Sequence, residues 1–230
     1  SSLRTNAAGT GPVTAPGQPV GWWGDLSGGG RPAMQDTPSR RPTYTVGLPA
    51  FGGLPAMQFD GVDDDLTSAL DISATNSPNL TVMMVYRQVA KTANGGLWGH
   101  DNGGWDRLQL LNFTAGGLPD GYPIATAGNR SPVNGMATNT TLLYTAVLRN
   151  GVVGGSYVYL DGRSDATSGL PGFTSSEGAG LASFTLGNIA PGSGYRGNVE
   201  IGEVLVFDAA LEEDGRQTAE AYLRRKWLGV

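Results

Sequence analysis

The end of the chain, residues 198–230, has the clearest local signals and constrains the fold most. Its first part, Val199–Phe207, is rich in β-branched and aromatic residues, a composition typical of a strand. Acidic residues at 212–214 precede basic residues at 224–226, which is the charge order that a helix dipole favours. We therefore expect a strand followed by a helix that packs on the sheet containing that strand. The expected apolar face of this helix consists of Ala219, Tyr222, Leu223 and Trp227.

Turn residues divide the rest of the chain into short segments. The 230 residues include 37 glycines and 14 prolines, which are spread along the sequence rather than gathered in one linker. The dipeptides Asn150-Gly151 and Asp161-Gly162 favour type I′ hairpin turns. These features predict an all-β fold: a two-sheet antiparallel β-sandwich of the jelly-roll type with one C-terminal α-helix. Its other expected strands lie at residues 43–46, 57–60, 80–87, 97–100, 107–111, 142–148, 156–160 and 183–186.

The length of the chain suits one domain with one core. Residues 1–19 contain several glycines and prolines and are expected to form an extended N-terminal arm, with residues 20–230 as the jelly-roll domain. The sequence starts without a methionine, which suggests a trimmed chain or a piece of a longer protein. The longest apolar run, residues 80–86, is far shorter than the roughly 20 residues that span a bilayer, so we expect a soluble protein without membrane insertion.

The charge balance and the absence of cysteine exclude several functions. The chain has 15 basic and 20 acidic residues and a net charge of -5, so it lacks the electrostatic attraction that drives binding to nucleic acid. Because the sequence has no cysteine, it forms no disulfide, no thiolate nucleophile and no zinc site built on sulfur.

Glu200 and Glu203 are the only pair of carboxylates on an expected strand, and a glycoside hydrolase of this class needs such a pair on one face of the strand, so that both converge on one glycosidic bond. Three residues apart in a regular strand, they point to opposite faces. A β-bulge at Gly202 would bring them to the same face. We expect structural roles instead, with Glu203 half-buried beside an arginine or a backbone N–H and Glu200 solvated, and we assign no catalytic residue.

His100 is the sole histidine and is the last residue of one of the expected strands. A role as general base needs a carboxylate partner, which Asp101 or Asp106 would supply. The polysaccharide lyases of this fold use Tyr, His, Arg and Gln from adjacent strands, and the sequence has no matching strand pattern. We therefore expect His100 to be a turn residue beside a glycine-rich loop.

Several motifs, in their order along the chain, resemble the concanavalin A-like, laminin G-like jelly-roll domains. The opening residues 3–20 are similar to versions found in bacteriophage and prophage structural proteins. The resemblance covers nearly the whole chain. Its motifs are Val20-Gly21 with Asp25-Leu26-Ser27-Gly28, Arg41-Pro42-Thr43-Tyr44, Phe59-Asp60-Gly61-Val62-Asp63-Asp64, Thr81-Val82, Asp161-Gly162, Thr185-Leu186-Gly187, residues 197–207 and residues 222–227.

Aromatic side chains supply the faces on which sugar rings stack. Trp105 is the best candidate for an exposed platform, because it lies in a polar loop whose Asn and Asp side chains can bind sugar hydroxyls. Trp23, Trp98 and Trp227 are expected in the core. The predicted carbohydrate site consists of Trp105, Asn102, Asp106, His100, Tyr122 and Tyr195.

Four aspartates, Asp60, Asp63, Asp64 and Asp65, form an acidic corner. The family resemblance implies calcium there, because related modules bind Ca²⁺ at a sheet rim through carboxylate and carbonyl oxygens. A solvated turn is the alternative, and the spacing is not that of an EF-hand.

The resemblance implies a non-enzymatic module of a virion or phage-like particle, on a tail, fibre or head spike, that binds bacterial cell-surface carbohydrate. Two alternatives stay open: a polysaccharide-degrading glycoside hydrolase or lyase on the same fold, and a purely structural virion assembly or decoration domain. The expected partners are a bacterial surface glycan, other particle proteins and further copies of the chain. The expected location is the particle surface, which is extracellular when the module acts.

Overall fold

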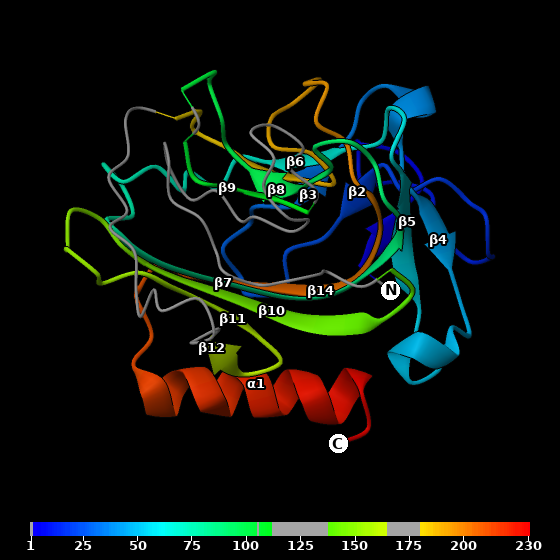
Figure 1. The fold of residues 1–230 in the computed structure, drawn as a ribbon. Coiled ribbons are helices and arrows are strands. Elements are labelled where there is room, and N and C mark those ends of the chain that lie inside the picture. Colours follow the sequence, from blue (N-terminus) through cyan, green and yellow to red (C-terminus); the bar gives the residue numbers. More distant parts are fainter. Residues whose placement is uncertain (1, 105, 112–137, 165–179) are drawn as a thin grey trace.

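The computed structural model describes residues 2–104, 106–111, 138–164 and 180–230. These residues form two seven-stranded sheets that face each other, with a helix on the outer side of one sheet (Figure 1). All strand pairings within the two sheets are antiparallel. The predicted two-sheet antiparallel sandwich with one C-terminal helix is confirmed. In the described ranges, no helix has the length and apolar character needed to cross a bilayer.

Neighbouring strands in both sheets come from distant parts of the sequence. The first sheet has the order β1 (Leu3–Arg4), β2 (Trp22–Trp23), β3 (Ala33–Met34), β6 (Leu66–Ser68), β13 (Phe184–Leu186), β8 (Gly96–Gly99) and β9 (Leu108–Leu110). The second sheet has the order β12 (Arg163–Ser164), β11 (Tyr157–Leu160), β10 (Thr141–Arg149), β7 (Asn79–Ala90), β14 (Asn198–Phe207), β5 (Ala56–Asp60) and β4 (Thr43–Thr45). Two short 3-10 helices, η1 (Pro38–Arg40) and η2 (Pro49–Phe51), lie in connections, and α1 (Glu213–Trp227) ends the fold.

The N-terminal residues contribute to the sandwich. Leu3–Arg4 pairs with β2 at the edge of the first sheet, and the side chains of Leu3 and Val13 are buried in the main core. The boundary between an arm and a domain at residue 19 stays a prediction.

Strand β7 is apolar on both faces because both are covered. Leu80, Val82, Met84 and Tyr86 point into the space between the sheets, whereas Met83 and Val85 point to the outer side, where they pack with residues of α1. In β5, Met57 and Phe59 share the inner face, as their alternation predicts. The main core therefore lies between the sheets, and a second cluster lies beneath α1.

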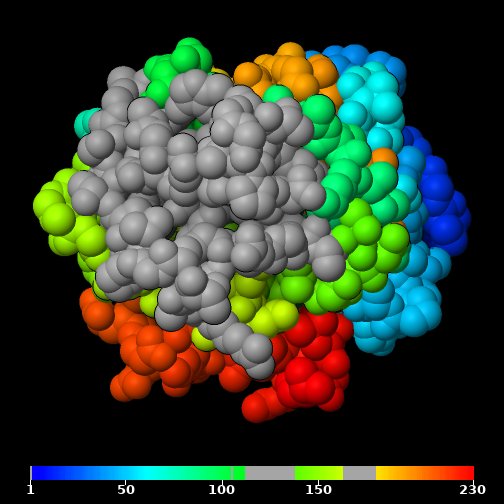
Figure 2. Space-filling view, in the orientation of Figure 1, coloured from blue at the N-terminus to red at the C-terminus, as the bar shows by residue number. Residues whose placement is uncertain are grey.

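The buried face of α1 carries two charged residues, Arg216 and Glu220, together with Leu223 and Trp227. The expectation that Tyr222 belongs to this face is wrong, because its side chain is 46% exposed. Arg216 pairs with Glu220 at 2.7 Å, and Glu220 also accepts a hydrogen bond from Thr145 in β10. These mutual bonds compensate for the loss of hydration of both charges. Figure 2 shows α1, coloured orange to red, along the lower rim of the molecule.

One of the two predicted hairpin turns is confirmed. Asp161 and Gly162 both have positive φ, 51° and 75°, as a type I′ turn requires, and they join β11 to β12. At Asn150-Gly151 only Gly151 has positive φ, at 72°, and the connection from β10 continues to Ser156. The prediction of a two-residue turn there is wrong, because the backbone N–H of Arg149 bonds to the Ser156 hydroxyl across a longer loop.

Candidate functional site

A β-bulge in β14 decides where its two glutamates point. The register between β14 and β7 shifts between Ile201 and Glu203, on either side of Gly202. Before the bulge Val199 and Ile201 face the main core, and after it Val204 and Val206 do. The inward-facing residues therefore have odd numbers before the bulge and even numbers after it. As a result, Glu200 and Glu203 both lie on the outer face.

Both glutamates have firm partners on that face. Glu200 is buried and accepts a hydrogen bond from Arg87 Nε at 2.6 Å, so the expectation that it is solvated is wrong. Glu203 accepts hydrogen bonds from Trp227 Nε1 at 2.5 Å and from the Tyr222 hydroxyl at 3.0 Å, and Lys226 Nζ lies 2.9 Å from it. The bulge thus aligns the two carboxylates but leaves them bound to the sheet and the helix rather than facing an open cleft.

Three of the four predicted calcium ligands converge. Asp60, Asp63 and Asp64 each offer a carboxylate oxygen within 4.8 Å of the others, a spacing that fits ligands of one Ca²⁺. Burial raises the pKa of Asp64 to about 7, and the carboxylates of Asp60, Asp63 and Asp65 add repulsion, although a hydrogen bond from the Asp60 backbone opposes the rise. The corner thus concentrates negative charge that a cation would neutralise.

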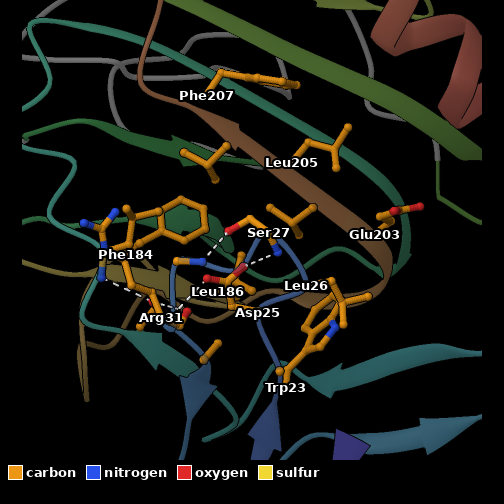
Figure 3. A pocket seen from close by; sticks show the side chains of 17 residues that line it. Trp23, Asp25, Leu26, Ser27, Arg31, Phe184, Leu186, Glu203, Leu205 and Phe207 are labelled. Atoms are coloured by element: carbon orange, nitrogen blue, oxygen red, sulfur yellow. Dashed lines mark hydrogen bonds between the residues drawn. The ribbon is translucent and has the colours of Figure 1, made fainter. Parts of the chain in front are cut away.

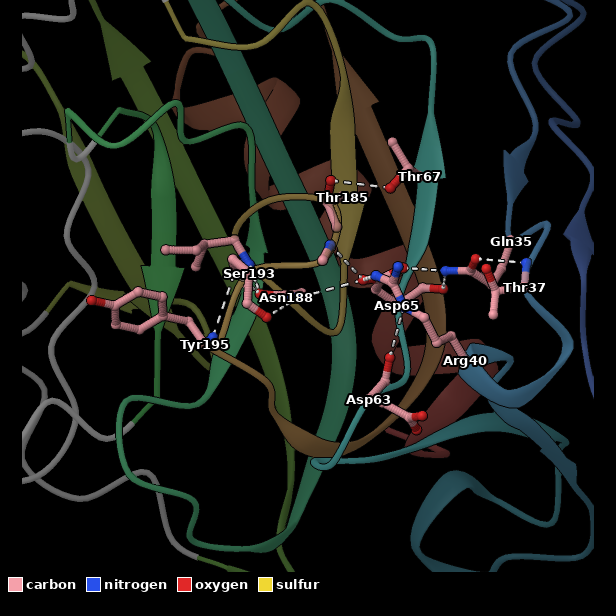
Figure 4. Close-up of polar contacts among 12 residues, drawn as sticks. Gln35, Thr37, Arg40, Asp63, Asp65, Thr67, Thr185, Asn188, Ser193 and Tyr195 are labelled. Carbon is pink, nitrogen blue, oxygen red and sulfur yellow. Dashed lines mark hydrogen bonds and ion pairs between the residues drawn. The ribbon is translucent and has the colours of Figure 1, made fainter.

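Asp65 lies apart from this cluster and is the centre of a buried polar network (Figure 4). Its carboxylate accepts hydrogen bonds from Gln35 Nε2 and Arg40 Nη2. It also accepts the backbone N–H of Gly192 at 3.1 Å and faces Asn188 Nδ2 at 3.5 Å. Asp65 therefore joins three connections, those after β3, before β6 and after β13, and has a structural role.

The predicted sugar loop after β8 is held by its own side chains. The Asp106 carboxylate accepts the Asn102 N–H, Asp101 accepts the Asp106 N–H, and the Asn102 side-chain oxygen accepts the Gly104 N–H, at 3.1, 3.1 and 3.2 Å. Asp106 is buried, whereas Asn102, Gly103 and Gly104 are exposed. The described residues of this loop, 101–104 and 106, therefore form a polar projection at one end of the first sheet that its own hydrogen bonds hold in place.

The other predicted sugar-binding residues are placed differently. His100 is fully buried, and its Nδ1 donates to the Leu181 carbonyl at 2.8 Å. Tyr195 is half-buried and packs on Leu108, Leu110 and Ile189. Trp105 and Tyr122 lie outside the described residues. Of the six, the structure brings Asn102 and Asp106 together.

A groove between the two sheets was missed by the sequence reasoning. It has a volume of about 540 Å³ and lies between the second half of β14 and the loop that joins β2 to β3 (Figure 3). Trp23 was expected in the core with Trp98 and Trp227, which are indeed buried, but Trp23 is half-buried and lines the groove. The signal available in the sequence was the position of Trp23 directly before the polar turn residues 25–30.

The floor of the groove is apolar and its mouth is polar. The loop at the mouth is shaped by Asp25, whose carboxylate accepts the backbone N–H groups of Ser27 and Arg31 at 2.8 and 3.1 Å. The pKa of Asp25 is lowered by hydrogen bonds from the Ser27 side chain and from the backbone of Arg31 and Ser27. Leu70, Phe184, Leu186, Val204 and Val206 form most of the floor.

The solved structures that this chain resembles include two kinds of glycoside hydrolase. A Trypanosoma rangeli sialidase in complex with the inhibitor DANA matches 93% of this chain and 31% of its own, at 17% identity and a TM-score of 0.57. An arabinofuranosidase complexed with arabinofuranosyl-α-1,2-xylobiose matches 91% of this chain and 51% of its own, at 12% identity and a TM-score of 0.60. No protein-family model and no curated protein sequence matches the chain.

This likeness establishes the fold and corrects the functional expectation. The chain spans about a third to a half of the length of these neighbours. They are hydrolases rather than particle proteins, so they favour the enzymatic alternative over the non-enzymatic virion module that binds bacterial carbohydrate. The β-sandwich itself agrees with the resemblance to concanavalin A-like domains.

Proposed function

We propose that this chain works in the enzymatic hydrolysis of glycans, as the β-sandwich part of a glycoside hydrolase. Two different hydrolases, a sialidase and an arabinofuranosidase, support the proposal by sharing the fold over most of this chain. Within the chain, the observation that carries it is the loop after β8, where side-chain bonds hold the exposed polar groups of residues 101–104 and 106 in one arrangement. Fixed polar groups bind sugar hydroxyls without the entropic cost of ordering a mobile loop.

The part assigned to this chain is contact with the substrate. Cleavage of a glycosidic bond requires a pair of carboxyl groups that flank the bond. Among the strand residues that the structure describes, Glu200 is bound to Arg87, and Glu203 is bound to Trp227 and Tyr222. Hydrolysis is therefore assigned to the complete enzyme, and glycan contact to Asn102 and its loop.

The test uses NMR titration and product analysis on the purified chain. Arabinoxylan oligosaccharides and sialyllactose are the probes, and we expect the amide resonances of residues 101–106 to shift with one of them. Asn102→Ala should weaken binding about tenfold, because a sugar hydroxyl loses its partner. Gln217→Ala, on the exposed side of α1, is the matched control and should bind as the wild type does.

Two outcomes would overturn this assignment. If neither probe shifts the loop resonances, the loop does not bind these glycans. If the chain itself releases sugar and Glu203→Gln abolishes the release, the chain is the catalyst and Glu203 acts in the reaction. Chromatography of the products after prolonged incubation distinguishes the second outcome from simple binding.

A further inference from the structure

We propose that the second half of β14 and the groove beside it bind an extended peptide segment of a partner protein as an added β-strand. The pairing between β5 and β14 covers only Asn198–Ile201. Glu203–Phe207, called here the open half of β14, pairs with β7 along one edge. Along its other edge it pairs with no strand in the part of the chain that the structure describes.

The edge is open because the chain before β5 turns away from the sheet. Residues 49–51 form η2 on the helix side, where the Phe51 ring packs edge-on against Trp227 with centroids 5.9 Å apart. A Cβ atom at Gly52 would lie 3.1 Å from the Trp227 carbonyl oxygen. The residues that would extend β5 alongside Glu203–Phe207 are thus held beneath α1.

The open half of β14 retains hydrogen-bonding capacity. In an antiparallel sheet, alternate residues direct their N–H and C=O groups to each side of the strand. The groups of Glu203–Phe207 that point away from β7 form no hydrogen bond with the other described residues. Such an edge is the template for strand addition, which supplies a peptide ligand with main-chain hydrogen bonds.

The burial of residues in β14 changes at the point where its pairing with β5 ends. Val199, Glu200 and Ile201 are buried where β5 covers them, whereas Glu203–Phe207 are half-buried although four of the five are apolar. Val204 and Val206 line the groove with Phe184 and Leu186. A strand added here would direct every second side chain into this apolar floor, because side chains alternate along a strand.

The charged residues at the two ends of the groove determine which kind of peptide fits it. Arg31 and Phe184 lie together at the end of the groove away from Glu203 (Figure 3). The Arg31 side chain is exposed, and although its charge attracts the Asp25 carboxylate, its guanidinium forms no ion pair or hydrogen bond with the described residues. Glu203, at the other end, is already neutralised by Lys226. The occupant that fits is an extended peptide with apolar residues at alternate positions and an acidic residue at the Arg31 end.

A sugar or an acyl chain fits this groove less well. A sugar requires polar partners, but the floor consists of aliphatic and phenyl groups. An acyl chain would leave the backbone groups of the open strand half without partners in an apolar contact, which is costly. This inference is independent of the proposed glycan contact, which uses the loop 101–106.

The test uses blocked seven-residue peptides with alternating apolar and polar residues and a fixed N-terminal Glu or Lys, because the N-terminal end of an antiparallel added strand lies beside Arg31. Amide hydrogen exchange followed by NMR reports on Glu203–Phe207, and fluorescence anisotropy gives the affinity. We expect Glu-ended peptides to slow exchange of the outward amides about tenfold, and scrambled peptides of equal composition to bind about tenfold more weakly. Arg31→Glu should shift the preference to Lys-ended peptides, whereas the matched control Arg225→Glu, on the outer face of α1, should not.

Several results would overturn the proposal. No slowing of exchange by any peptide in the set would remove strand addition. Equal affinity of wild type and Arg31→Glu for Glu-ended peptides would remove the charge selection. Protection by arabinoxylan oligosaccharides would assign the groove to sugar, and protection that rises with protein concentration alone would assign it to a second copy of this chain. Glycan binding by the loop 101–106 would be unaffected in each case.

Discussion

The indole ring of Trp227 lies so close to Gly202 that a Cβ atom at position 202 would come within 2.7 Å of it. Gly202 lies at the bulge of β14, and Trp227 is the last residue of α1. The indole Nε1 also donates to Glu203 at 2.5 Å. The bulge and the end of the helix therefore fix each other's position.

Gly202→Ala should lower the free energy of unfolding by about 1–3 kcal/mol, because the methyl group must displace a packed ring. Urea denaturation measures this change. Gly215→Ala in α1 is the matched control, since its nearest neighbour atom is 3.7 Å from the added Cβ, and it should stabilise the helix by about 0.5–1 kcal/mol. Unchanged stability of Gly202→Ala would show that Trp227 does not depend on this contact.

Asp65→Asn should lower the free energy of unfolding by about 2–3 kcal/mol. It removes the negative charge to which Arg40 and Gln35 both donate, and the new amide N–H group would face one of these donors. The comparison is Asp36→Asn, which changes an exposed carboxylate and should alter stability by less than about 0.5 kcal/mol. Equal denaturation midpoints for the two variants would contradict a central role for Asp65.

Asp64 should make stability depend on pH. Its pKa is about 7 in the folded protein against 3.8 as the ordinary value, so the folded state holds a proton that the unfolded chain has lost between these values. The stabilising contribution is therefore fully present below about pH 4 and is lost as the pH rises through 7. Denaturation curves from pH 4 to 8 should show a decline that Asp64→Asn reduces. An identical decline in the variant would assign it to other groups.

Calcium binding at Asp60, Asp63 and Asp64 stays a prediction, and the direction of its pH dependence can be stated. Because Ca²⁺ binds ionised carboxylates, it should raise the melting temperature more at pH 8 than at pH 5, and EDTA should reverse the rise. Asp63→Asn should remove the effect, and Asp36→Asn should retain it. A rise that survives in Asp63→Asn would place any calcium elsewhere.

Local patterns predicted the longer elements, such as β5, β7, β10, β14 and α1, but not the short strands β1, β2, β3 and β6. The alternation of Met57 and Phe59 in β5 reflects the period of two that one covered face imposes, and the continuous apolar run in β7 reflects cover on both faces. The charge order of the final segment predicted α1 within a turn. These signals lie within each element, so the sequence alone contains them.

Features that depend on distant partners were missed. Glu200 is buried because it forms an ion pair with Arg87 of another strand. Arg216 lies on the buried helix face because it pairs with Glu220 and stacks on the Tyr159 ring. The candidate groove exists because β5 stops short of Glu203. The sequence of residues 203–207 contains no local pattern that shows that β5 does not pair with them.

The open half of β14 also affects how the isolated chain behaves in concentrated solution. A bare strand edge with valines at alternate positions is a nucleus on which further chains can stack into fibrils. The charged residues Asp25 and Arg31 lie in the loop beside that edge and act as gatekeepers against stacking. Shortening this loop should therefore give a protein that forms thioflavin-positive fibres, with little loss of folding stability.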